Sequence, residues 1–317
     1  MCGTLYVVIP CFNEEEIFES TAEKIKAEMT RLIEKGVIGG DSRVLFVNDG
    51  STDGTWKMIC ENAERDRLFT GISLAHNSGE QNAYLAGMEQ AVKYADVLIT
   101  MDADLQDGTD AVEKMLYEYE NGNEIVYGVR TSRNKEPFLT RVTSEAFYKL
   151  MSRAGTELVR EHSQYRLMSR RAASELLKCG EKNIFIPALV PLLGFKHSIV
   201  CHERKPRENG KSHYNFKSLF YLAVRAMTSY SVKPIHLIGL LSALCFIAGI
   251  IGMVVFIVKC CLGDFSNTAL IFSCLWLAVS AVLFALRILG EYIYDISLNA
   301  KNRPRYIIEE SLLKKDE

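Results

Sequence analysis

A short apolar run that ends in a cluster of carboxylates, DVLITMDADLQD at residues 96–107, constrains the fold of this chain most strongly. Residues 97–99 are rich in β-branched side chains, which predicts a buried strand rather than a turn of helix. Asp102 and Asp104 then follow the carboxyl end of that strand, where open α/β sheets bind ligands. Two carboxylates one residue apart repel each other unless a cation lies between them. The stretch therefore predicts a sheet edge that holds a divalent metal.

The metal chemistry of this stretch indicates a class of ligand. Mg²⁺ typically takes one or two protein carboxylates and leaves its other positions to water and phosphate oxygens. A pair such as Asp102 and Asp104 therefore suits a nucleotide diphosphate. A plain solvated acidic loop is the alternative, because Asp is common in the turns that follow strands.

Strand and helix patterns alternate along the first ~130 residues. Short apolar runs predict strands at 6–9, 44–47, 72–74 and 125–128, and apolar residues at helical spacing predict helices between them. This alternation predicts an α/β domain with a largely parallel sheet and helices on both of its faces.

The turns after successive strands are rich in polar residues. NDGSTDG at 48–54 follows the second predicted strand, and HNSGEQ at 76–81 follows the third. Asn13, followed by Glu16, has the spacing of a capping box for the first helix. Because the carboxyl ends of parallel strands meet at one edge of a sheet, such turns together with the acidic stretch predict a pocket there.

The composition and the missing motifs exclude several classes of protein. A formal net charge of −2 over 317 residues gives no support for a nucleic-acid partner. No GxGxxG follows the first strand, which disfavours a dinucleotide enzyme. The nine cysteines include no CxxC pair, which indicates a reduced compartment rather than a disulfide framework. His197, Cys201 and His202 lack a fourth ligand at a spacing that suits zinc.

Basic residues gather beyond the strand predicted at 125–128. Arg130 and Arg133 follow it directly, and a basic, polar loop runs from 204 to 217. Residues 165–168 predict one more strand. Solvated surface charge is the ordinary interpretation of such runs, whereas proximity to the predicted diphosphate site favours phosphate binding.

Two long apolar stretches predict membrane-spanning helices. Residues 235–258 form a run of 24 residues whose only strongly polar member is His236, long enough to cross ~30 Å of hydrocarbon. A second span covers about 268–289. Basic residues flank the pair on both outer sides, so both termini and the first domain are expected in the cytoplasm, at the cell inner membrane. The amino terminus has no signal-peptide pattern, and residues 215–233 are patterned as an amphipathic interfacial helix.

Several motifs taken together resemble one known family. VVIPCFNEEE, VNDGSTDGT, MDADLQD, YGVRTSR and YRLMSRR occur in this order, ahead of SVKP and the two apolar spans. The set is similar to that of the polyprenyl-phosphate glycosyltransferases, inverting family-2 enzymes of the GT-A fold that include dolichyl-phosphate mannose synthases and bactoprenol glucosyltransferases. The resemblance covers about residues 4–308. It implies a Rossmann-like, mainly parallel GT-A domain at 1–214, the interfacial helix at 215–233, a transmembrane hairpin at 234–290 and a cytoplasmic tail at 291–317.

The resemblance also implies roles for individual residues. Those expected at the nucleotide are Pro10, Asn13, Glu14, Asp49 and Asp102. Those expected at a Mg²⁺ or Mn²⁺ ion are Asp102, Asp104 and Gln106. The implied catalytic set, with its phosphate-contacting arginines, is Asp104, Arg130, Arg133 and Arg166. The residues implied at the acceptor phosphate or in a mobile loop are Arg141, Arg207, Ser212 and His213.

The implied reaction is transfer of a hexose from a nucleotide sugar, with UDP-glucose taken from its frequency in the family, to a polyprenyl (undecaprenyl) phosphate at the membrane. Three departures from the family pattern occur. Gln164 stands where many relatives carry Asp, His213 stands where many carry Lys, and Gly108-Thr109-Asp110 replaces the Pro-Pro-Glu that follows the acidic motif in the family. A phosphate dianion needs no strong base, so Gln164 is compatible with transfer. Two alternatives stay open, a membrane-tethered transferase to a saccharide or protein acceptor and a non-catalytic nucleotide-sugar-binding scaffold. Formation of a homo-oligomer also stays open.

Overall fold

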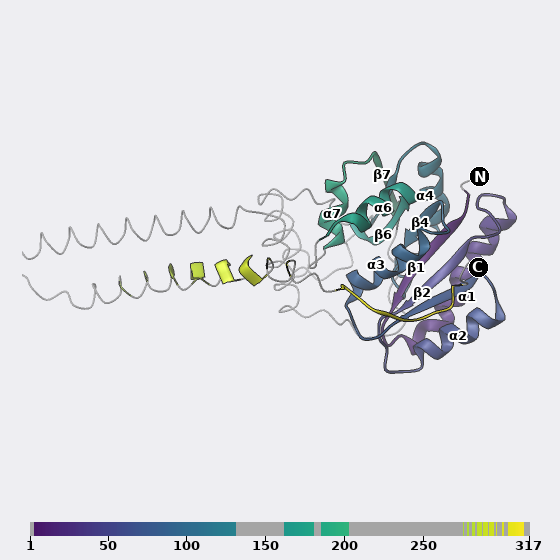
Figure 1. Ribbon diagram of the computed structural model, residues 1–317. Helices are drawn as coiled ribbons and strands as arrows, with labels where there is room; N and C mark the ends of the chain where they lie inside the picture. The colour runs from purple at the N-terminus through teal and green to yellow at the C-terminus, as the bar shows by residue number, and fades with distance from the viewer. Residues whose placement is uncertain are drawn as a thin grey trace, which may run out of the picture. The chain divides into compact units, whose positions relative to one another are not determined.

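The computed structural model describes residues 3–130, 162–180, 185–202 and 304–313, together with scattered positions between 275 and 300. The chain divides into two compact units. The first consists of residues 1–148, 157–213 and 303–317, and the second of residues 149–156 and 214–302. The strands drawn in Figure 1 belong to the first unit, which therefore holds the sheet edge predicted from the sequence.

An eight-stranded sheet forms the centre of the first unit (Figure 1). The strand order is β7-β5-β6-β4-β1-β2-β3-β8. The strands are β1 Leu5–Cys11, β2 Arg43–Asn48, β3 Phe69–Leu74, β4 Val97–Thr100, β5 Ile125–Arg130, β6 His162–Ser169, β7 His197–His202 and β8 Ile308–Ser311. β1 pairs in parallel with β2 and β4, β2 with β3, and β5 with β7, whereas β6 and β8 run antiparallel to their neighbours. The predicted α/β domain with a mainly parallel sheet is confirmed.

Helices cover both faces of this sheet (Figure 1). They are α1 Glu15–Glu34, α2 Thr55–Arg65, α3 Glu80–Ala91, α4 Ala111–Glu120, α6 Arg170–Lys178 and α7 Ile186–Leu192. Successive side chains of a strand point to opposite faces. Leu5, Val7 and Ile9 of β1 accordingly join the core that also contains apolar residues of α1 and α4. Val8, between them, lies against α3.

Helix α3 lies close to the sheet at Gly87. A Cβ atom at this position would lie 2.3 Å from Cγ1 of Val8 and 2.7 Å from Cγ2 of Val47. No side chain fits at such a separation, so the glycine sets the distance between α3 and the sheet. Tyr84 stands three residues earlier on the same helix and is fully buried, at 1% exposed.

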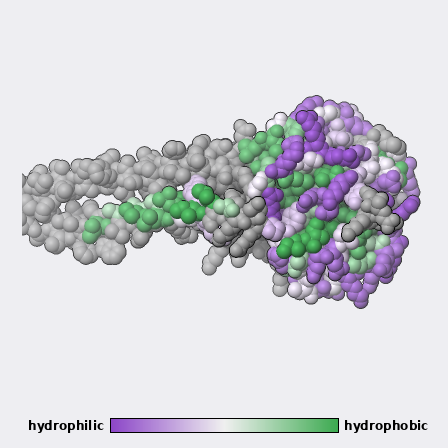
Figure 2. All heavy atoms as spheres, in the orientation of Figure 1, coloured by the Kyte–Doolittle hydropathy of each residue, from purple (hydrophilic) through white to green (hydrophobic). Residues whose placement is uncertain are grey.

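The surface of the first unit is largely polar. On the face shown in Figure 2, hydrophilic side chains cover much of the unit, with apolar ones between them. Its exposed large apolar side chains come from separate elements and include Phe12, Tyr117, Leu192 and Ile199. The scattered helical positions described in the second unit also include exposed apolar side chains, among them Leu275, Val282, Phe284 and Leu286.

Residues near the carboxyl terminus return to the edge of the sheet. β8 pairs antiparallel with β3, with Leu74 opposite Ile308. Ala75 donates its backbone N–H to the carbonyl of Ile307 at 2.9 Å. The sequence predicts only a tail over 291–317, because a four-residue strand with three exposed side chains has no apolar alternation of its own. This strand depends on the edge that β3 offers.

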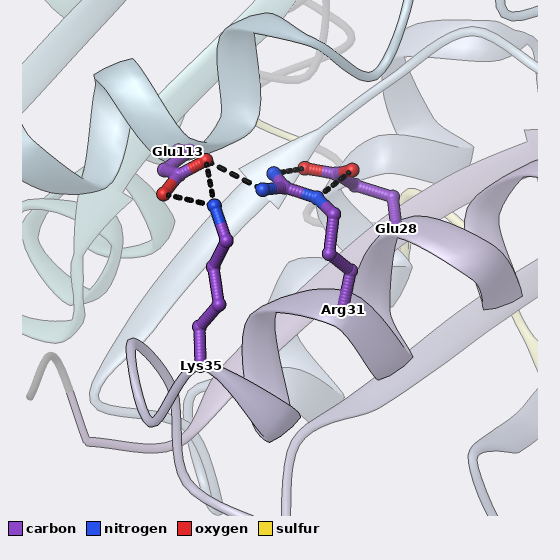
Figure 3. Close-up of polar contacts among 4 residues, drawn as sticks. All are labelled: Glu28, Arg31, Lys35 and Glu113. Atoms are coloured by element: carbon purple, nitrogen blue, oxygen red, sulfur yellow. Dashed lines mark hydrogen bonds and ion pairs between the residues drawn. The ribbon is translucent and has the colours of Figure 1, made fainter.

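A network of ion pairs joins α1 to α4 (Figure 3). Arg31 donates to both carboxylate oxygens of the buried Glu28, at 2.9 and 2.6 Å, and to Glu113 of α4 at 2.8 Å. Lys35 donates to the same Glu113 at 3.1 Å. Hydrogen bonds from Arg31 and then from Lys35 lower the pKa of Glu113. The network holds α4, which begins shortly after the acidic stretch, against α1.

The predicted membrane hairpin is not supported. The interfacial helix at 215–233 and the span at 235–258 fall outside the described residues, and the span at 268–289 is described only at scattered positions. Across the part of the chain that the structure describes, no helix is both long enough and apolar enough to cross a bilayer. Helix α1 has 20 residues, but charged side chains recur along it. This finding contradicts the predicted location in the cell inner membrane with both termini and the catalytic domain cytoplasmic.

The ion-pair network predicts a pH-dependent contribution to stability. A carboxyl whose pKa is lowered in the folded state stabilises the fold above its unfolded pKa and loses this effect as the pH falls through the folded value. Glu113→Gln should therefore cause a small fall in melting temperature at pH 7, and the gap from wild type should close as the pH drops below the ordinary value of 4.5. Thermal melts from pH 7 to pH 3 measure both curves. A gap that persists unchanged at pH 3 would contradict the ionic origin.

Candidate active site

The polar turns predicted from the sequence meet at one edge of the sheet. Cys11 lies opposite Asn48, and Asn48 opposite Ser73, so β1, β2 and β3 end side by side. β4 ends next to β1, because Val8 pairs with Thr100. Strands β5 and β7 lie on the other side of β6. They pair in parallel, run in the same direction as β4, and end next to each other. Residues that follow these strands therefore share one rim.

Asp49 organises the loop that follows β3. Its side chain is buried, at 3% exposed, and its two carboxylate oxygens accept the backbone N–H groups of Ser78 at 2.7 Å and Gly79 at 3.0 Å. Burial raises the pKa of Asp49, and these two hydrogen bonds oppose the rise. Gly50, at φ +66°, permits the close approach, because a Cβ there would lie 2.5 Å from the backbone of Asn77. Asp49 thus fixes the position of the loop at 76–79 beside the end of β2.

The turn after β1 is tied to the turn after β2. Asn13 adopts φ +54°, donates its backbone N–H to Ser51 Oγ at 3.0 Å and accepts the N–H of Thr52 on its side-chain oxygen at 2.8 Å. Glu14 donates its N–H to Thr55 Oγ1 at 3.0 Å. The predicted capping box is therefore wrong: α1 has no side-chain cap, because the Asn13 side chain serves the neighbouring loop.

The structure brings the predicted nucleotide residues to these two turns. Pro10 lies in β1 opposite Val47 of β2, one residue before Cys11 ends the strand, and Asn13 and Glu14 follow it. Asp49 stands directly after β2. All four therefore lie at the rim where β1 and β2 end.

The acidic stretch forms a tight turn after β4. Leu105 donates its N–H to the carbonyl of Asp102 at 3.2 Å, and Gly108 donates to the carbonyl of Leu105 at 2.9 Å. Leu105 adopts φ +46°, which is rare for a branched side chain and marks a backbone held in place by its surroundings. Asp104 accepts the N–H of Gln106 at 3.2 Å. The turn keeps the three predicted metal residues within one loop.

Asp102 lies in a strongly negative environment. The hydroxyl of Tyr84 donates to its Oδ1 at 2.7 Å. Burial raises the pKa of Asp102, the charges of Asp107 and Asp104 raise it further, and the Tyr84 hydrogen bond and Arg130 lower it. Burial and the adjacent Asp102 raise the pKa of Tyr84 well above 10, so its hydroxyl remains a donor at neutral pH. A bound cation would relieve this concentration of charge.

The residues of the turn suit a hard cation that is shared with a ligand. Among the residues that the structure describes, no three His, Cys, Asp or Glu side chains form a ready metal cluster. Asp102 and Asp104 supply two carboxylates and Gln106 an amide, and Mg²⁺ commonly takes its remaining ligands from water and phosphate. The donor set therefore fits Mg²⁺ or Mn²⁺ bound together with a diphosphate.

A cluster that the sequence did not reveal lies beside this turn. Asp107, the last acid of the motif, accepts from Arg130 Nε at 2.8 Å and from Arg130 Nη2 at 3.0 Å. His202 of β7 lies with Nε2 3.1 Å from the same carboxylate, and its ring meets Tyr165 edge-on at 5.3 Å. Arg130, predicted at a phosphate, is thus oriented by Asp107. The sequence signal that could have indicated this cluster is Asp107, a third carboxylate in the acidic stretch to which the motifs assign no role.

Arg166 is a buried cation within β6. It pairs with Thr100 of β4 on one side and Tyr127 of β5 on the other, and it is 1% exposed. Its Nη2 donates to the side-chain oxygen of Gln164 at 3.0 Å, whereas Nε and Nη1 find no acceptor in the part of the chain described. Burial lowers its pKa to about 10, so it stays charged at pH 7. Arg166 therefore places a positive charge inside the sheet, where it acts on Tyr84, Tyr127 and Asp102.

The other predicted site residues cannot be placed. They fall outside the residues that the structure describes, and they are Arg133, Arg141, Arg207, Ser212 and His213. Their roles stay predictions.

Comparison with known proteins identifies the family. Residues 6–177 match the domain described as Glycosyl transferase family 2. The chain belongs to glycosyl transferase family 2. This family-2 glycosyltransferase is 39% identical over 306 residues to the uncharacterized glycosyltransferase YkoT of Bacillus subtilis (strain 168), which covers 96% of this chain and 91% of the relative. It is 31% identical over 318 residues to the SfII prophage-derived bactoprenol glucosyl transferase of Shigella flexneri, over 96% and 97% of the two chains.

A comparison with solved structures also returns the mannosyltransferase PcManGT from Pyrobaculum calidifontis in complex with GDP-Man and Mn²⁺. It has a TM-score of 0.43 at 13% identity and covers 95% of this chain and 76% of that one. The family match and the curated relatives confirm the predicted resemblance and the predicted enzyme class, a glycosyltransferase.

The cluster around Asp107 predicts a loss of stability in one variant of this glycosyltransferase. Asp107→Asn removes one charge from a pair in which Asp107 is 7% and Arg130 26% exposed. Loss of this charged partner of Arg130 should cost about 1–3 kcal/mol of unfolding free energy, measured by urea denaturation. Asp41→Asn, at a side chain 94% exposed, is the matched control and should leave the midpoint unchanged. Equal midpoints for both variants would contradict a structural pairing of Asp107 with Arg130.

Proposed function

We propose that this glycosyltransferase moves a hexose from a nucleotide sugar to the phosphate of a polyprenyl lipid such as undecaprenyl phosphate, with UDP-glucose as the first donor to test. The observation that carries the proposal is the acidic turn after β4, where Asp102 and Asp104 lie on the rim shared with the turns after β1 and β2. The similarity to bactoprenol glucosyl transferases supports the lipid acceptor.

The protein would bind the nucleotide sugar at two places, its nucleoside and its diphosphate. The turns that contain Pro10, Asn13, Glu14 and Asp49 would receive the nucleoside. A Mg²⁺ or Mn²⁺ ion held by Asp102 and Asp104 would act as a Lewis acid on the diphosphate. Arg130, oriented by Asp107, would face charge that develops on the leaving group.

Transfer would proceed with inversion and without a side-chain base. One oxygen of the acceptor phosphate bonds to the anomeric carbon as the bond from that carbon to the diphosphate breaks, and the diphosphate leaves with the electron pair. A phosphate monoester has a second pKa of ~6 and is mostly dianionic at pH 7, so no proton has to be removed. Gln164 fits this scheme, because its side-chain oxygen accepts a hydrogen bond from Arg166 and is not needed as a base.

The acceptor phosphate needs further positive charge. By family resemblance, Arg133, Arg141, Arg207 and His213 are proposed to supply it, and Ser212, in the same loop as Arg207 and His213, is proposed to contact the phosphate as a neutral hydrogen-bond donor. A histidine at 213 would make this contribution dependent on pH, because a free imidazole has a pKa of ~6.5.

The reaction is tested by a transfer assay with the full chain. Undecaprenyl phosphate dispersed in detergent is offered with a panel of UDP- and GDP-sugars, in the presence of Mg²⁺, Mn²⁺ or EDTA, beside soluble saccharide and peptide acceptors. A lipid-linked product from one donor, lost with EDTA, is the expected result. Product only on a soluble acceptor would overturn the lipid assignment, and nucleotide binding with no product on any acceptor would favour the scaffold alternative.

The acidic turn predicts a large catalytic defect in one variant. Asp104→Ala removes a carboxylate of the proposed metal site and should lose ~3 kcal/mol of transition-state stabilisation, roughly a hundredfold in kcat/KM. Asp41→Ala, at an exposed carboxylate elsewhere, should keep the wild-type rate. Undiminished turnover by Asp104→Ala would contradict the role of this turn.

A further inference from the structure

The side chain of Tyr84 forms a hydrogen bond with Asp102, the first carboxylate of the acidic turn. Its ring is buried in α3, at 1% exposed, and its hydroxyl donates to Asp102 Oδ1 at 2.7 Å. The two residues are 18 positions apart, on a helix and on the turn after a strand. The hydrogen bond therefore exists only because α3 lies against the sheet.

The position of this hydroxyl is set by rigid neighbours. Gly87 brings α3 into contact with Val8 of β1 and Val47 of β2, so the helix has little freedom to move away from the sheet. The buried charge of Arg166 acts on both Tyr84 and Asp102 from β6. Tyr84 is therefore a fixed donor rather than a surface group that adapts to its partner.

A free carboxylate turns easily about its last side-chain torsion. A hydrogen bond to one oxygen selects one orientation, and the second oxygen of Asp102 has no hydrogen-bond partner among the described residues. Groups that orient metal ligands in this way typically change metal affinity by about 10–100-fold when they are removed. The arrangement at Asp102 has the same form, with one oxygen bound by protein and one left for a cation.

We propose that Tyr84 is a positioning residue for the metal site: it fixes Oδ1 of Asp102 so that Oδ2 faces a divalent cation bound with the donor diphosphate. The proposal rests on the function proposed above for the acidic turn. It adds a residue from α3 to a site that the sequence motifs place entirely in loops.

The test measures metal binding directly. Mn²⁺ is titrated into the purified full chain, alone and with saturating UDP or GDP, and the free ion is followed by its electron paramagnetic resonance signal. Tyr84→Phe keeps the ring and removes only the hydroxyl. Tyr6→Phe is the matched control, because Tyr6 is also buried, at 6% exposed, but lies near the amino end of β1. Thermal melts without metal compare the folding of both variants with wild type.

Tyr84→Phe should weaken Mn²⁺ binding by about tenfold, while Tyr6→Phe binds as wild type does. Equal Mn²⁺ affinity in Tyr84→Phe and wild type would overturn the positioning role. Equal weakening in both variants would also overturn it, because the effect would then be a general one on the fold. A wild-type chain that binds no Mn²⁺ under any of the three conditions would overturn the metal site itself, a failure of the proposed function that is distinct from the first result.

Discussion

Compensation of buried negative charge is the constraint on which the candidate site depends. Three carboxylates, Asp102, Asp104 and Asp107, occur within the seven residues that follow β4, and burial raises the pKa of the first. Isolated charges are costly to bury, so each needs a partner. Tyr84 donates a hydrogen bond to Asp102, and Arg130 donates two hydrogen bonds to Asp107. A divalent cation shared by Asp102 and Asp104 would complete this balance, and a diphosphate would then complete the coordination of the cation.

The strand order explains how these partners reach one place. The antiparallel β6 lies between β4 and β5, and so joins the parallel group of β1 to β4 to the parallel pair of β5 and β7. This insertion places Arg166 beside the end of β4, although it lies more than sixty residues further along the chain. The turns after β1 and β2, which are proposed to bind the nucleotide, lie on one side of the acidic turn, and Arg130 and His202 lie on the other. A transferase needs such an arrangement, with a donor pocket and a source of positive charge on either side of the leaving group.

The sequence predicts the elements well and their long-range contacts poorly. Apolar runs and polar turns are local signals, so β1 to β6 and the rim of the sheet follow from them. The roles of Tyr84, Asp107 and His202 depend on which strands and helices become neighbours, which no local pattern encodes. β8 has no apolar alternation of its own and forms a strand only by pairing with the edge strand β3, so its sequence does not predict it. The capping box at Asn13 fails because its side-chain oxygen instead accepts the backbone N–H of Thr52, in a loop 39 residues away. Hydrophobic run length and the family resemblance predicted a membrane hairpin that the described helices do not support.

The central claim is that Asp102 and Asp104 hold a divalent cation against the donor diphosphate. Crystals of the protein grown with Mn²⁺ and the donor nucleotide, measured at the manganese absorption edge, test it most directly. The account predicts an anomalous peak at ~2.2 Å from a carboxylate oxygen of Asp102 or Asp104, with further contacts to phosphate oxygens. Nucleotide bound at the rim with no anomalous peak beside the acidic turn would contradict it.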